Sequence, residues 1–172
     1  MASLMDDLVG ILNNECQQYQ NLLELSSSKT PVLVTGNLDK LAEITDEEQG
    51  VVAKIAILDK KREEAMKTIA DVLNRDVETL KLTDLIQILA KKPDEQRALS
   101  IVCDNLKMTA DRVVSVNAQN QELINSSLEM VQFEMNILQA AKRAPETANY
   151  TKTAGTSGDV IGMMSGRFDA KQ

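Results

Sequence analysis

The chain has 172 residues and a formal net charge of −7, and 43% of its residues are hydrophobic although only 2% are aromatic and tryptophan is absent. A core of Leu, Ile, Val, Ala and Met beside many Glu, Lys and Gln predicts an all-α fold, because unbranched side chains lose little rotamer freedom in a helix. The acidic balance and the scarcity of aromatic stacking partners exclude a general nucleic-acid binder, which needs a basic surface.

The sequence contains no apolar run long enough to cross a membrane, and its N-terminus, MASLMDDLVG, carries acids where a signal peptide carries bases. We therefore expect a cytoplasmic protein without stable membrane insertion. Cys16 and Cys103 lack C-x-x-C spacing, so we expect two buried thiols and no disulfide. The prolines Pro31, Pro93 and Pro145 divide the chain into three helical regions and a tail.

The first helical region presents one apolar face, whose members recur at steps of three and four residues: Leu4, Leu8, Ile11, Leu12, Tyr19, Leu22, Leu23 and Leu25. This run ends in SSSKTP, residues 26–31, so we expect the helix to stop there. A short helical turn at 32–35 would follow, with Thr30 as its cap. Gly36 and Asn37 then predict a break and a new N-cap.

The second region starts at Leu38 and keeps its apolar stripe to Leu73, which is about ten helical turns. After it, Asp76 and Thr83 are candidate caps. A compact apolar cluster then predicts a short helix from about Asp84 to Lys91 that covers one end of a bundle.

The third region begins at Pro93 and continues to about Ala144, a rod of roughly 75 Å at 1.5 Å per residue. That is too long for a compact globule of this size. We therefore expect an elongated antiparallel helical bundle or coiled coil of three long helices plus a short helix, forming one domain over residues 1–144. Such a helix can be covered by its own chain or by a second copy, so a homo-oligomer stays open.

The C-terminal segment, residues 145–172, is rich in Gly, Ser and Thr and has no helical period, which predicts a flexible tail. It nevertheless contains an apolar group: Val160, Ile161, Met163, Met164 and Phe168. Two interpretations stay open. The tail is either an uninformative frayed end or a docking peptide that orders on a partner or on the bundle.

The sequence offers little chemistry for catalysis. It contains no histidine, P-loop, nucleophile elbow or Rossmann glycine pattern, so we expect no enzymatic activity, no cofactor and no metal. Three charged residues, Glu15, Glu48 and Arg62, interrupt the apolar stripes. Glu48 and Arg62 lie about 21 Å apart along one helix and cannot pair, so each needs a partner on another helix or must reach the edge.

Two asparagines stand where the third helical region should be apolar. Counting in sevens from Leu99 and Cys103 places Asn120 and Asn117 on the stripe, where a buried amide costs about 1–3 kcal/mol unless it is hydrogen-bonded. Either they fix the register against a neighbouring helix, or the neighbours stop covering the stripe here. In the second case the helix presents an apolar face to a partner beyond this point: Leu123, Ile124, Leu128, Val131, Met135 and Leu138.

Several motifs occur in an order and spacing that together resemble the FlgN family of flagellar type III export chaperones over most of the chain. They are E-x-x-x-Y-x-x-L-L at 15–23, GNLDKLAEI at 36–44 followed by Glu47 and Glu48, LDKKREE at 58–64, N-x-x-N-x-x-L-I at 117–124, and Tyr150 followed by Gly155 and the FDAK of 168–171. The SSSKTP segment departs from the family pattern, in which this stretch is often helical and charged.

The resemblance implies a cytosolic bundle that binds hook-associated flagellar proteins, keeps their helical ends from premature assembly and delivers them to the export apparatus. It also implies that the C-terminal part grips the client. Here that part comprises the apolar residues 123–138 named above, Asn117 and Asn120 at their start, Tyr150 and the apolar residues of the tail. Met130, Met135, Met163 and Met164 suit an adaptable surface, although Met130 and Met135 are equally consistent with core filler. A structural or adaptor coiled coil is the alternative function.

Overall fold

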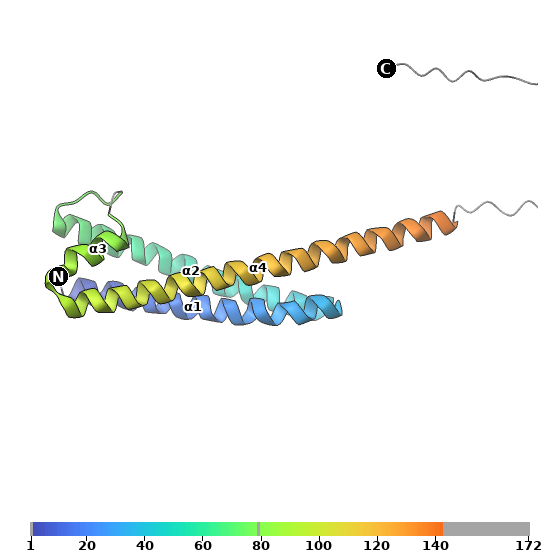
Figure 1. Ribbon diagram of the computed structural model, residues 1–172, viewed down its shortest axis with the longest axis horizontal. Coiled ribbons are helices and arrows are strands. Elements are labelled where there is room, and N and C mark those ends of the chain that lie inside the picture. The colour runs from blue at the N-terminus through green and yellow to red at the C-terminus, as the bar shows by residue number, and fades with distance from the viewer. Residues whose placement is uncertain (1, 79, 143–172) are drawn as a thin grey trace, which may run out of the picture. The chain divides into compact units, whose positions relative to one another are not determined.

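Figure 1 shows the computed structural model, which describes residues 2–78 and 80–142. Over those residues it consists of α1 (Ala2–Thr35), α2 (Leu38–Leu73), α3 (Leu82–Ile88), the 3₁₀ turn η1 (Leu89–Lys91) and α4 (Pro93–Lys142). The prediction of a helical bundle with three long helices and a short one is therefore confirmed. The chain divides into two units, Met1–Phe133 and Glu134–Gln172, and the packing described below is that of the first. The predicted tail, 145–172, and its boundary at Ala144 lie outside the described residues.

A two-residue turn joins α1 to α2, as predicted. Gly36 takes a φ of 68°, the left-handed conformation that ends many helices, and the backbone N–H of Asn37 donates to the carbonyl of Val32 at 3.3 Å. The side chain of Asn37 accepts a hydrogen bond from the backbone N–H of Lys40 at 3.0 Å, so it caps α2. Glycine and asparagine thus supply the end of one helix and the beginning of the next.

The predicted interruption of the first helix is wrong, because α1 runs through SSSKTP to Thr35 with Pro31 inside it. A proline in a helix removes one backbone hydrogen bond and crowds the preceding turn. Pro31 is exposed, and so is Ser27, whose carbonyl loses its helical hydrogen bond, so this carbonyl does not have to be buried without a partner. The turns on either side are held by the buried side chains of Ser26 and Val32, which are 0% and 8% exposed. Thr30 is therefore not a cap.

The long helices of the first unit pack side by side (Figure 1). Ion pairs join Lys29 of α1 to Glu48 of α2, and Glu15 of α1 to Arg62 of α2. The later residue of α1 thus pairs with the earlier residue of α2, so the two helices are antiparallel. On α4, Asn120 bonds to Ser26 and Thr30 of α1, and both helices run in the same direction (Figure 1). α4 is consequently antiparallel to α2.

Two apolar clusters form the core. The larger one lies at the end of the bundle where α1 begins, and it gathers residues from every helix: Met5, Leu8, Leu12, Ile69, Ala70, Leu80, Leu85, Leu89, Leu99 and Val102. The smaller one joins Leu22, Val51 and Val113. Because α3 and η1 contribute Leu85 and Leu89 to the larger cluster, the prediction that the short helix covers one end of the bundle is confirmed.

The local caps of α3 differ from those predicted. The helix begins at Leu82, and Asp84 accepts a hydrogen bond from the backbone N–H of Lys81 at 3.0 Å. Asp76 instead accepts from the backbone N–H of Glu78 at 3.1 Å, within the preceding turn. Thr83 is exposed inside the helix and caps nothing in the hydrogen bonds of the described residues.

Candidate functional site

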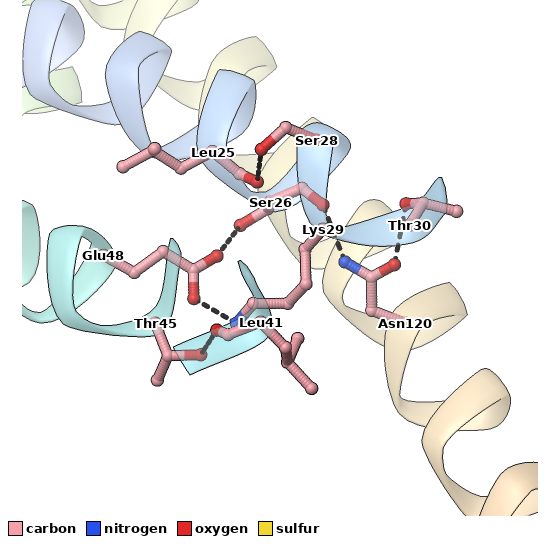
Figure 2. Close-up of polar contacts among 9 residues, drawn as sticks. All are labelled: Leu25, Ser26, Ser28, Lys29, Thr30, Leu41, Thr45, Glu48 and Asn120. Carbon is pink, nitrogen blue, oxygen red and sulfur yellow. Dashed lines mark hydrogen bonds and ion pairs between the residues drawn. The ribbon is translucent and has the colours of Figure 1, made fainter. Parts of the chain in front are cut away.

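A polar junction joins three helices near the α1–α2 turn (Figure 2). Asn120 of α4 donates from Nδ2 to the backbone carbonyl of Ser26 and accepts at Oδ1 from the hydroxyl of Thr30, each at 2.7 Å. On the other side of α1, the hydroxyl of Ser26 donates to Glu48 of α2 at 2.8 Å, and Lys29 forms an ion pair with the same carboxylate. One residue, Ser26, therefore connects to both neighbouring helices.

Asn120 is buried, with 3% of its surface exposed, and both ends of its amide are hydrogen-bonded. A buried amide that keeps its hydrogen bonds avoids the cost of desolvation, and it disfavours slipped arrangements in which these bonds are lost. The interpretation as a register-fixing residue therefore holds for Asn120. It does not hold for Asn117, which is exposed and lies at the edge of a groove beside Leu22 and Glu48.

The second alternative, that the neighbouring helices stop covering the apolar stripe of α4 near the asparagines, also holds. Asn120 is the last buried residue of α4. Leu123 and Ile124 are half-buried, and every residue from 125 to 142 is exposed. Leu128, Val131, Met135 and Leu138 are between 49% and 63% exposed. In Figure 1 α4 continues past the turn between α1 and α2. We call the residues Ile124, Leu128, Val131, Met135 and Leu138 the first stripe.

The sequence interpretation missed part of this surface. Phe133 and Ile137 are 65% and 52% exposed, and Met130, considered either as surface or as core filler, is 64% exposed. Met135, at 49%, is not core filler either. Counting a single stripe left Phe133 and Ile137 out, although apolar residues on more than one side of a helix already indicate more than one partner. The candidate residues Tyr150, Val160, Ile161, Met163, Met164 and Phe168 lie outside the described residues.

A second polar contact joins α1 to α2 further from the turn. Glu15 is only 2% exposed, and its Oε2 lies 3.5 Å from Nη1 of Arg62, which also pairs with Asp59. Burial raises the pKa of Glu15 above its ordinary value, Arg62 partly offsets this, and Asp59 adds to it. Glu48 and Arg62 were each expected to need a partner on another helix, and each forms an ion pair with a residue of α1. They do not pair with each other.

The two cysteines are free thiols, Cys16 buried and Cys103 half-buried. Burial raises the pKa of the Cys103 thiol, with Asp104 acting in the same direction and Arg62 against it. Within residues 2–78 and 80–142, no group of three or more His, Cys, Asp or Glu side chains could hold a metal ion. Among the described helices, none combines the length and the apolar character needed to cross a membrane.

One comparison with known proteins identifies a family for this chain. No curated protein and no solved structure gives a significant match to the chain. The family model described as FlgN protein matches residues 1–158, which is most of the sequence. The chain therefore belongs to the FlgN family, whose members are flagellar export chaperones.

Proposed function

We propose that the exposed end of α4 binds the helical termini of hook-associated flagellar proteins in the cytoplasm, prevents their premature assembly and hands them to the export apparatus. Family membership supplies the chaperone role and the class of partner, flagellar proteins. The exposed apolar surface of α4 supports the choice of this segment for the contact.

The observation that carries the proposal is the loss of cover after Asn120. The first stripe continues the apolar spacing of the buried part of α4, with residues at i, i+4, i+7, i+11 and i+14. A helix with such anchors packs against an amphipathic partner helix. Because this part of α4 is already helical, binding would not carry the entropic cost of forming the helix.

The amino-terminal half of α4 acts as the anchor for this surface. Leu99, Val102 and Val113 are buried in the two core clusters, and Asn120 is bonded to α1. The residues that follow Asn120 are part of the same helix, so their backbone is already ordered before a partner binds, which reduces the conformational freedom lost on binding. The C-terminal segment 145–172, including Tyr150, is also part of the proposed client-binding region. It lies outside the residues that the structure describes.

The proposal is tested with purified full-length chain and a hook-associated protein from the same organism, by isothermal titration calorimetry. Replacing Leu128→Ser and Val131→Ser together should weaken binding about a hundredfold, since each fully buried aliphatic anchor contributes about 1.5–3 kcal/mol. The matched control is Met108→Ser with Val114→Ser, which removes two exposed apolar side chains, 57% and 68% exposed, from the covered part of α4.

The control pair should leave the affinity within about twofold of the wild type. Equal losses in both pairs would contradict a binding surface localised to the end of α4. A wild-type chain that forms no complex with any hook-associated protein would contradict the client class. Truncation after Ala144 then measures the share of the tail, and we expect it to weaken the complex while the bundle stays folded.

A further inference from the structure

The end of α4 carries a second apolar stripe on a different side of the helix. Met130, Phe133 and Ile137 follow one another at i, i+3 and i+7, and their side chains are 64%, 65% and 52% exposed. At about 100° per residue, this second stripe lies about 150° around α4 from the first stripe. One packed helix covers an apolar face of roughly 100°, so a partner on the first stripe leaves the second one uncovered.

Charge distinguishes the two stripes. Glu122 and Glu129 lie along the outer border of the second stripe, and Glu134 lies about midway between the two stripes; all three are exposed. The outer border of the first stripe instead carries amides: Gln121, Asn125, Gln132, Asn136 and Gln139. No lysine or arginine occurs between Arg112 and Lys142. The second stripe is therefore apolar with carboxylates on its outer border and one between the two stripes, which complements an apolar face bordered by lysine or arginine.

The same charges argue against a second copy of this chain on this stripe. Pairing two copies in either orientation would bring Glu122 and Glu129 of one chain toward carboxylates that border the same stripe of the other, with no base in the segment to offset the repulsion. We infer that the second stripe binds a separate basic amphipathic helix. This inference rests on the proposed function, in which the first stripe holds another helix of the cargo. The end of α4 then lies between two partner helices.

The test uses the full chain and two synthetic helical peptides with the same leucine face, one with lysine and one with glutamate beside that face. Fluorescence anisotropy should show tighter binding of the lysine peptide. Met130→Ser with Phe133→Ser should weaken that binding about tenfold or more. Glu122→Gln with Glu129→Gln should weaken it about twofold to fivefold at low salt, and less at high salt.

The matched comparison is Leu128→Ser with Val131→Ser, which should reduce the affinity for the lysine peptide less than the second-stripe pair does. Equal binding of the two peptides, or no loss on changing Met130 and Phe133, overturns the inference. A shift from dimer to monomer by sedimentation in the second-stripe variant also overturns it, because the stripe would then join two copies. All variants change exposed side chains, so circular dichroism should show an unchanged helix content.

The inference and the proposed function fail in different ways. If first-stripe variants lose the hook-associated protein and second-stripe variants keep full affinity for it and for the lysine peptide, the proposed function stands and the second site does not exist. If the wild type binds the lysine peptide at the second stripe but no hook-associated protein, the client class is wrong. The second stripe would then bind a basic helix of another protein.

Discussion

α4 is one helix with two different surroundings. From Pro93 to Asn120 one apolar face of the helix packs into the core, where Leu99 is fully buried; from 121 to 133 comparable side chains such as Leu128 are exposed. The apolar residues do not separate the two parts, because both parts carry leucine, valine and methionine at helical spacing. The difference lies in the neighbours, since α1 ends at Thr35 and α2 begins at Leu38. Apolar periodicity therefore predicts a face that packs, and it does not identify the molecule that packs against it.

The largest expected effect is on stability, and it compares the same substitution in both parts of α4. Leu99→Ala should lower the free energy of unfolding by about 2–5 kcal/mol, because it opens a cavity in the larger core cluster. Leu128→Ala should change it by less than about 0.5 kcal/mol. Urea unfolding measures both. A comparable loss at Leu128 would mean that a second copy covers this part of the helix in solution.

A smaller effect is expected at the boundary between the two parts. Asn120→Ala should destabilise the chain by about 1–3 kcal/mol, because it removes both hydrogen bonds that join α4 to α1 here, the one to the Ser26 carbonyl and the one from the Thr30 hydroxyl. The control is Asn117→Ala, three residues earlier on the same helix and exposed, which should stay within about 0.5 kcal/mol of the wild type. If the two alanine variants unfold at the same urea concentration, Asn120 does not fix α4 against α1.

The smallest effect, a trend of stability with pH, concerns Glu15, a buried residue of α1 and not of α4. Because burial raises the pKa of Glu15, the folded chain keeps this proton to a higher pH than the unfolded chain does. Its contribution to stability is complete below the ordinary pKa and is lost as pH rises through the folded-state value. Relative to Glu15→Gln, the wild type should therefore become less stable as pH rises above about 4.5.

Urea titrations of both chains at a series of pH values measure this difference, and other titrating groups largely cancel in it. A difference that does not change with pH would show that Arg62 fully compensates the burial of Glu15. A wild type that gains stability relative to the variant over this range would reverse the sign and would mean that the pKa of Glu15 is lowered.

The helix ends were predicted well where the residues that mark an end in the sequence also form that end in the structure. Gly36 and Asn37 form the turn, and Pro93 begins α4, because helix ends depend on residues within one turn of them. Pro31 misled for the opposite reason. Its cost is local, but the contacts that outweigh it, at Ser26 and Val32, come from the packing of α1 against the other helices. A single sequence does not contain those contacts explicitly.

The candidate surface was predicted in outline and not in detail. Heptad counting placed Asn117 and Asn120 on one stripe, yet positions three apart differ by about 60° around a helix, which is enough to bury one and expose the other. The first stripe could be predicted because it continues the core pattern. The second stripe could not be assigned by the same count, since Met130, Phe133 and Ile137 follow a spacing of their own and have no buried counterpart.

The position of the turn at Gly36 and Asn37 sets the length of α4 that α1 and α2 can cover. α1 and α2 end and begin there together, so the place of these two residues determines how much of α4 stays free. Lengthening both helices by one heptad before and after the turn would extend the cover along α4 by about 10 Å at 1.5 Å per residue, without altering one residue of the surface. In this chain the length of the exposed apolar segment of α4 is therefore set by a turn that is not itself part of the proposed binding surface.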